Sequence, residues 1–322
     1  MDETRKALSV SDLPDDILLH VFSFLDALSL CKVRRVCKRW NHLSTDEILW
    51  KHKLLTDVKS WKHVSNAFTE ETGNADESTC DMYLKNSPEI QTWKREFYQR
   101  TTLHQLTNLL RNFLPTKKFA FGVGASAMDS FGKGRSFFSK LLSFDSANVF
   151  QHCGEFPGRF RGAGGGFQFK YKRHMLELCL MYLAPKLLRE AMTVEQKIEQ
   201  LKKMMESTGY SELLTSLKGY IHTIDSRILE GVTEKNTIEV IQQQSEEVLL
   251  IDAKLKPDIP MLILSVRKVE ADPHISPYEI SKSLRLNTLS RPWMVCECSA
   301  EMIYRDVVDG MDWLIGTATP LL

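Results

Sequence analysis

The sequence predicts two parts: an all-α N-terminal unit of three short helices, and a C-terminal α/β domain with a mainly parallel six-stranded sheet. Between Leu13 and Trp50, apolar side chains recur at the helical spacing of three and four residues. From Lys118 onward, short apolar runs alternate with helical segments, which is typical of a parallel α/β sheet. We expect a flexible tail over 1–10, the helical unit over 11–55, a linker with an acidic loop and a helical stalk over 56–116, and the α/β domain over 117–322.

Composition narrows the classes of partner and compartment. The 322 residues are enough for about two domains, and the formal net charge of +1 gives no overall field that favours nucleic acid or an anionic membrane. No apolar run approaches the length that spans a bilayer, and the N-terminal MDETRKALSV lacks the apolar core of a secretory signal. Seven cysteines, an odd number, favour reduced thiols. We therefore expect a cytoplasmic protein, with a nuclear phase left open, and neither a nucleic acid nor a membrane as partner.

The N-terminal unit is expected to have more apolar surface than it can bury. Pro14 suits a first helical turn, and Asp15 and Asp16 favour the positive end of the helix dipole. A second apolar face follows from Val33 to Trp40, and Asp46 is a candidate N-cap for a third helix. About forty residues rarely cover such a surface alone, so the surplus indicates a partner.

At these residues the sequence resembles the F-box family. The matching segments are Leu13-Pro14, Phe24-Leu25-Asp26, Val36-Cys37-Lys38-Arg39-Trp40 and Leu49-Trp50. The resemblance implies docking onto the Skp-type adaptor of a cullin–RING ubiquitin ligase, and through it onto the cullin and RING subunits. The adaptor-binding candidates are Leu13, Pro14, Ile17, Leu18, Val21, Phe22, Leu25, Val33, Val36 and Trp40, some of which would face inward. The alternative is a three-helix hairpin that serves as core for the rest of the chain.

The segment that follows is expected to connect the two parts. SNAFTEETGNADESTCD is polar and acidic, which predicts a solvated loop. PEIQTWKREFYQRTTLHQLTNLLRNFL has roughly helical apolar spacing and predicts a stalk that fixes the second domain relative to the first.

The α/β domain is expected to contain six strands. The candidates are Phe119–Gly122, Gly166–Tyr171, Leu176–Tyr182, Gly219–Asp225, Pro260–Val266 and Trp293–Cys298. Helices are expected near 135–143, 187–206, 235–249, 277–286 and 303–315. Only the second and third strands lack a helix between them, so Lys172, Arg173 and His174 are expected to form a hairpin turn. Ile303, Val307, Met311 and Leu314 predict one buried face of the last helix.

This order of elements resembles the small GTPases, and the C-terminal third is similar to their Arf branch. DIPMLILSV resembles the fifth strand, SPYEISKSLRL the next helix, and RPWMVCECSAEMIYRDVVDGMDWLI the last strand, its loop and the closing helix. The resemblance covers residues 118–322 and is carried mainly by those after 219.

The nucleotide-binding motifs of that family are degenerate here. Gly132-Lys133 is present after the first strand, but Gly134 takes the place of the Ser or Thr that would bind Mg²⁺. Where the family reads guanine with an aspartate, this chain has Val269, which cannot accept the two N–H bonds. We expect a nucleotide-free, metal-free and cofactor-free scaffold, and leave open whether the glycine-rich loop binds an anion.

Two further features have structural explanations. The second predicted strand is expected at the sheet edge, where its backbone could pair with a substrate; the candidate substrate-binding residues are Phe167, Phe169, Lys170, Lys172 and Arg173. Cys296-x-Cys298 lacks the spacing of a zinc site and predicts two thiols packed in the core.

The function implied by these resemblances is recruitment of protein substrates to a ubiquitin ligase, without catalysis by this chain. The alternatives are a GTP-binding switch tethered by its F-box, and an F-box scaffold that acts outside a ligase. The substrate, its degron, any requirement for phosphorylation and a homodimeric state are left open.

Overall fold

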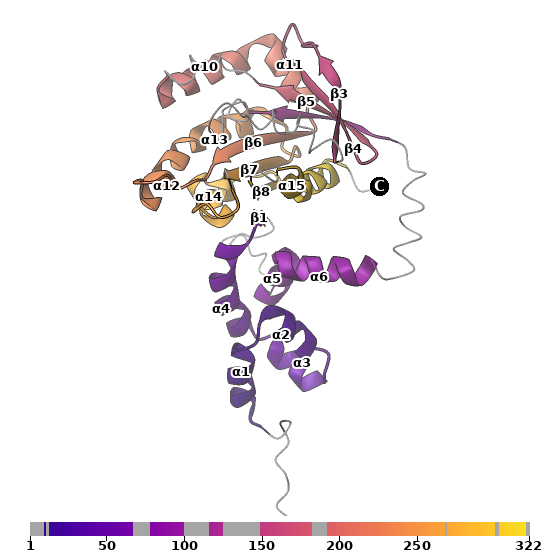
Figure 1. Cartoon of the computed structure of the whole chain (residues 1–322), viewed down its shortest axis with the longest axis vertical. Coiled ribbons are helices and arrows are strands. Elements are labelled where there is room, and N and C mark those ends of the chain that lie inside the picture. Colours follow the sequence, from indigo (N-terminus) through magenta and orange to yellow (C-terminus); the bar gives the residue numbers. More distant parts are fainter. Residues whose placement is uncertain are drawn as a thin grey trace, which may run out of the picture. The chain divides into compact units, whose positions relative to one another are not determined.

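The chain folds as two compact units that interrupt each other in sequence (Figure 1). The computed structural model describes residues 10, 13–66, 78–99, 116–124, 149–181, 192–267, 269–299 and 303–319. The first unit, the helical unit, consists of 1–59 and 70–107, and the second, the sheet unit, of 60–69 and 108–322. The chain therefore passes between the units three times.

The helical unit begins with four helices, where the sequence predicted three. They are α1 (Asp15–Ser23), α2 (Ala27–Val33), α3 (Lys38–Ser44) and α4 (Glu47–Asp57). The predicted second helix is divided because two residues cap helices of their own. The Asp26 carboxylate accepts a hydrogen bond from the Ser29 N–H at 2.6 Å, and Cys37 Sγ accepts one from the Trp40 N–H at 3.4 Å. Asp46 caps α4 as predicted, accepting from the Ile48 N–H at 2.9 Å.

Two helices from the predicted linker complete the helical unit. They are α5 (Thr79–Asn86) and α6 (Pro88–Gln99). The Trp50 and Tyr83 rings lie 5.1 Å apart, and both residues are almost fully buried. The Tyr83 hydroxyl donates to Asp57 at 2.6 Å, so α5 is bonded to the end of α4. Residues 78–99 are therefore part of this unit's core, a role that the linker prediction missed. Most of the predicted acidic loop (67–77) and stalk (100–115) lies outside the described residues.

The sheet unit contains an eight-stranded sheet, two strands more than predicted. Its order is β1-β8-β7-β6-β2-β5-β4-β3. The bounds are β1 His63–Ser65, β2 Lys118–Val123, β3 Phe150–Phe156, β4 Gly166–Tyr171, β5 His174–Leu180, β6 Gly219–Asp225, β7 Met261–Arg267 and β8 Trp293–Ser299. Strands β8, β7, β6, β2 and β5 run parallel, while β1, β4 and β3 join by antiparallel pairing. The additional strands are the outermost two, and their short or polar sequences give no periodic apolar signal.

The helices of the sheet unit agree with the prediction in order and differ in number. They are α10 (Val194–Glu206), α11 (Thr208–Ser216), α12 (Glu234–Gln243), α13 (Ser245–Lys254), α14 (Pro277–Ser283) and α15 (Ile303–Thr317). The predicted helix at 235–249 is divided near Gln244, and α11 was not predicted. The predicted helix at 135–143 lies outside the described residues.

One apolar core of the sheet unit lies between the sheet and α15. Val307, Met311 and Leu314 of α15 are buried as predicted, against alternate residues of the strands such as Leu262 and Leu264. Cys296 and Cys298 point into the same core, which confirms that these thiols are packing residues. The predicted hairpin is a tight turn at Lys172 and Arg173, with Lys172 at φ 52°.

Candidate functional site: an apolar helix face and the carboxyl end of the sheet

Helix α1 has an inner and an outer apolar face. Leu18 and Phe22 are 0% and 2% exposed and belong to the core of the helical unit. Ile17, Val21 and Phe24 follow one another at i, i+4 and i+7 and are 44%, 44% and 77% exposed. A helix of nine residues with apolar side chains on both sides can cover a core and still offer a contact surface.

The structure divides the ten predicted adaptor-binding residues into three sets. Pro14, Ile17, Val21 and Val36 are exposed. Leu13, Leu25, Val33 and Trp40 are partly buried. Leu18 and Phe22 are interior and so belong to the candidates that were expected to face inward; apolar spacing alone could not identify them, because it does not separate two neighbouring faces that are both apolar. Phe24 and Ile48, which is 78% exposed, were missed from the set.

Arg39 of α3 forms hydrogen bonds with residues at the start of α1. Its guanidinium donates to the Asp15 carboxylate at 2.8 Å and to the Leu13 carbonyl oxygen. The rings of Phe22 and Trp40 meet edge to face with centroids 5.6 Å apart. These contacts hold Leu13 and Pro14 at the edge of the outer face, and they connect the first and third of the four N-terminal helices.

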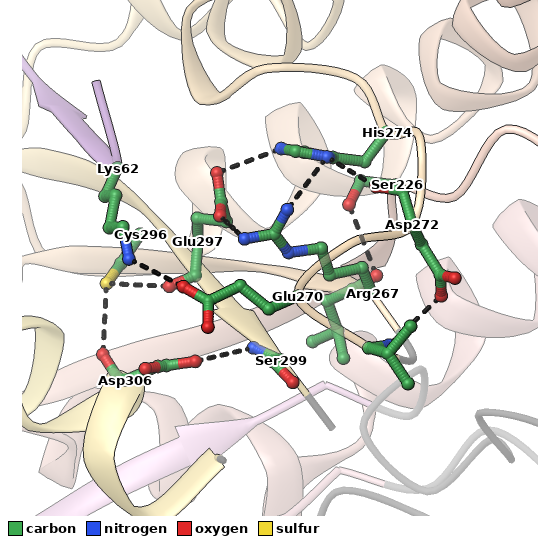
Figure 2. Close-up of polar contacts among 12 residues, drawn as sticks. Lys62, Ser226, Arg267, Glu270, Asp272, His274, Cys296, Glu297, Ser299 and Asp306 are labelled. Carbon is green, nitrogen blue, oxygen red and sulfur yellow. Dashed lines mark hydrogen bonds and ion pairs between the residues drawn. The ribbon is translucent and has the colours of Figure 1, made fainter. Parts of the chain in front are cut away.

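The second candidate site lies at the carboxyl ends of β7 and β8, where open α/β sheets bind ligands. Here the Arg267 guanidinium forms an ion pair with the Glu297 carboxylate, both side chains being 8% exposed (Figure 2). His274, from the segment after β7, places Nε2 3.0 Å from Glu297 Oε2 and Nδ1 3.0 Å from the Asp272 carbonyl oxygen. Figure 2 shows the imidazole and the guanidinium converging on the same carboxylate.

These contacts shift the pKa of both partners. The hydrogen bond to Glu297 raises the pKa of His274 above its usual 6.5, although burial opposes the shift. Burial by itself would raise the pKa of Glu297, but the hydrogen bond from His274 and the nearby positive charges hold it below 4.5. Nε2 faces the Glu297 carboxylate and Nδ1 the Asp272 carbonyl oxygen, which suits the doubly protonated ring, whereas the Arg267 guanidinium nitrogen 3.1 Å from Nδ1 opposes it. Glu297 then balances two cations.

Val269, the residue predicted to stand in place of a base-reading aspartate, lies beside this network. Arg267 is directed to Glu297, and the Val269 N–H donates to the Asp272 carboxylate at 3.0 Å. The adjoining cavity has a volume of about 270 Å³, below the range typical of small-molecule sites. Its lining residues are Lys62, His63, Glu270, Cys296, Glu297, Asp306 and Asp309. Four of these carry carboxylates and Lys62 pairs with Glu270 at 3.2 Å, so the lining disfavours a phosphate.

The predicted substrate-binding edge is corrected. Strand β4 is paired on both sides, with β5 and with β3, so β3 is the outer strand of the described sheet. Phe169 is fully buried, and Lys172 is paired with Asp312 of α15. Lys170 is exposed, while Phe167 is partly buried and Arg173 lies in the hairpin turn. The error arose because β3 carries few apolar residues and a register shift between His152 and Gly154, so no strand was predicted there.

The other predictions concern nucleotide binding, metal binding and membrane crossing. Gly132 and Lys133 lie outside the described residues. Within the described part of the chain, no three His, Cys, Asp or Glu side chains gather as a group that could hold a metal ion. No helix among the described residues has both the length and the apolar character needed to cross a bilayer.

Comparison with known proteins finds similarity of the N-terminal segment to F-box proteins and similarity of almost the whole chain to one kind of F-box protein. The F-box-like family profile matches residues 10–56. F-box only protein 4 of Bos taurus is 23% identical over 338 residues, which cover 97% of this chain and 84% of that protein. F-box only protein 4 of Homo sapiens is 22% identical over 336 residues, covering 96% and 84%. F-box/LRR-repeat protein 12 of Mus musculus is 47% identical over 45 residues, which are 14% of each chain.

Proposed function

We propose that this chain, an F-box protein that resembles F-box only protein 4 along almost its whole length, is a substrate-recognition subunit of an SCF-type ubiquitin ligase. The observation that carries the proposal is the outer face of α1, where Ile17, Val21 and Phe24 are exposed within the segment matched by the F-box-like profile. An exposed apolar face on so small a helical unit favours a protein partner over water.

The partner proposed for this face is the Skp-type adaptor, and through it the cullin and RING subunits. Burial of three large apolar side chains on a rigid helix would contribute several kcal/mol. Arg39 and Trp40 support the proposal because Arg39 fixes the start of α1 and Trp40 packs against Phe22 near its end before binding. The chain would not catalyse ubiquitin transfer; it would hold the substrate near the charged enzyme and so raise its effective concentration.

The sheet unit is proposed to recruit substrates as a GTPase-like scaffold that binds no nucleotide. Two features support this. The inner six strands keep the predicted sequence of one antiparallel hairpin among parallel strands joined through helices. After β7, Val269 stands where a base-reading aspartate would be, and the nearby Arg267 is engaged by the buried Glu297. The free edge at β3 replaces β4 as the proposed place for an added substrate strand.

Substitution of Val21 by Asp tests the adaptor surface. Capture of purified adaptor should weaken by about 100-fold or more, because binding would bury an unpaired carboxylate. The matched control is Val240→Asp on α12, which is 57% exposed and lies in the other unit. Both variants should keep the thermal midpoint of the parent, since each side chain is solvent-accessible. Equal adaptor capture by Val21→Asp and the parent protein would refute the proposal.

A further inference from the structure

One face of the sheet carries a group of cations that are exposed among the described residues. Register places Lys118 of β2, Met175 of β5, Lys170 of β4 and Gln151 of β3 in one row across four strands. The neighbouring residues on these strands, such as Phe119, Leu176 and Phe169, point to the core beneath α15. The row therefore belongs to the opposite face, and Lys118, Lys170 and Gln151 are exposed on it.

A buried carboxylate organises this face. Glu177 follows Met175 by two residues on the same face of β5 and is 3% exposed. Its two oxygens accept from Arg159 in a two-pronged ion pair, from Lys118 at 2.8 Å and from Gln168 at 2.8 Å. Burial alone would raise the pKa of Glu177, but these donors lower it below 4.5, so the carboxylate stays charged at neutral pH.

Arg159 is thereby fixed with part of its guanidinium facing outward. The group lies over the Phe156 ring, 5.0 Å from the centroid, and its side chain remains 48% exposed. Two of its nitrogens are engaged by Glu177, while a guanidinium has five N–H donors. An arginine held by a buried carboxylate and an aromatic ring loses little entropy when it binds another anion.

The charge balance of the face is positive. In β2, β3, β4 and β5, which the structure describes in full, the carboxylates are Glu177 and Glu155, and register places Glu155 opposite Phe167, on the side that packs against α15. Glu177 is therefore the one carboxylate that these strands supply to the face with Lys118, Lys170 and Arg159, so two positive charges remain in excess. Gln151 and Gln168 add hydrogen-bonding groups without adding charge. The described side chains of this face therefore carry a net positive charge.

We propose that the face formed by Lys118, Arg159, Lys170 and Gln151, the cationic face, binds an acidic segment of a protein substrate. The carboxylates of such a segment would accept hydrogen bonds from Arg159 and meet Lys118 and Lys170. Charge complementarity argues for this occupant, because a basic or apolar segment would leave the excess cations without counter-charges. The inference rests on the proposed role as a substrate receptor and names the chemistry of the partner.

The test measures binding of a fluorescent glutamate- and serine-rich peptide to the full chain in complex with adaptor, by anisotropy at low salt. Lys170→Glu should weaken binding by about five- to ten-fold, since it reverses an exposed charge next to the peptide. Gln151→Glu, which removes no cation, should weaken it by about two- to three-fold. Lys235→Glu, the same charge reversal at an exposed position of α12, should change affinity less than two-fold. The difference should fade at high salt.

Three results would overturn the proposal: no binding of the peptide to the parent complex, equal weakening by Lys170→Glu and Lys235→Glu, or equal binding of a lysine- and serine-rich peptide. Adaptor capture is measured in parallel for every variant and should not change. Failure of the parent chain to capture adaptor would instead count against the proposed ligase role, so the two failures are distinguishable. Thermal midpoints check that each variant is folded.

Discussion

Single buried polar residues fix the ends of elements in this protein. Arg291 is 2% exposed, and its guanidinium forms an ion pair with Asp252. It also donates to the carbonyl oxygens of Lys256 at 2.9 Å, Ile259 at 3.0 Å and Asp252 at 2.6 Å. One side chain thus satisfies backbone oxygens at the end of α13 that would otherwise be buried without donors. Arg291 was not singled out from the sequence, because its partners come from a segment more than thirty residues away.

Substitution of Arg291 should therefore be costly even by lysine. Arg291→Met leaves several buried acceptors and Asp252 without a donor, and should lower the free energy of unfolding by about 3–5 kcal/mol. Arg291→Lys should lower it by about 2 kcal/mol, because an ammonium cannot reproduce the planar arrangement of donors. Urea denaturation measures both values. Arg285→Met, at an exposed position nearby in sequence, is the control; comparable losses for Arg285→Met and Arg291→Met would contradict this account.

At the scale of elements, the segment after β7 contacts β8 through two titratable side chains, His274 and Glu297. The raised pKa of His274 means that its contribution to stability is fully present below pH 6.5 and is lost as pH rises through the folded value. The lowered pKa of Glu297 means that its contribution is present above pH 4.5 and is lost as pH falls through the folded value. Both contributions are therefore available together between about pH 4.5 and 6.5.

His274→Gln should thus destabilise the protein in a pH-dependent way. The difference in unfolding free energy between the parent and His274→Gln should be largest near pH 5.5 and should shrink as the pH rises through the raised pKa of the folded parent imidazole. The charged groups that face the ring are Glu297 and Arg267. Chemical denaturation at several pH values gives this difference, with His152→Gln on exposed β3 as the control. A difference that is constant across this range would show that the imidazolium is not involved.

The elements also show which parts of the fold can be predicted from a single sequence. Strand β6 was predicted with its observed bounds, because six of its seven residues are buried and its ends are marked by Gly219 and Asp225. Strand β3 was missed because Gln151, His152 and Cys153 are exposed in succession and give no alternation. The outer face of α1 was recognised as apolar, but Leu18 and Phe22 could be separated from Ile17 and Val21 only when the packing of the other helices was known.

For the whole molecule, the interleaved units determine which fragments can fold. The helical unit needs α5 and α6, since Trp50 packs against Tyr83 and the Tyr83 hydroxyl donates a hydrogen bond to Asp57. Three short helices were predicted because local periodicity ends near Leu55, whereas the contacts that complete the unit come from residues 78–99. The cationic face was likewise beyond prediction, since it depends on the register of four strands, one of them unpredicted.

Two fragments test whether the helical unit folds without α5 and α6. Residues 1–107 should unfold cooperatively on heating, with tryptophan emission typical of buried indole. Residues 1–60 should show less helix per residue and red-shifted emission, because Trp50 would face water. Circular dichroism and fluorescence of both fragments make the comparison. Equal thermal midpoints and equal emission maxima would mean that α5 and α6 are dispensable.

The pairing of β1 with β8 bears on how the protein is made. Val64 lies opposite Val295, so a strand that leaves the ribosome early must wait for a partner that is synthesised much later. Until β8 has been made, the nascent chain cannot close this side of its sheet and keeps an unpaired strand edge. Synthesis of β8 is therefore coupled to the closure of the sheet, and shortened chains that lack β8 should be recognised by cellular quality control as unfinished.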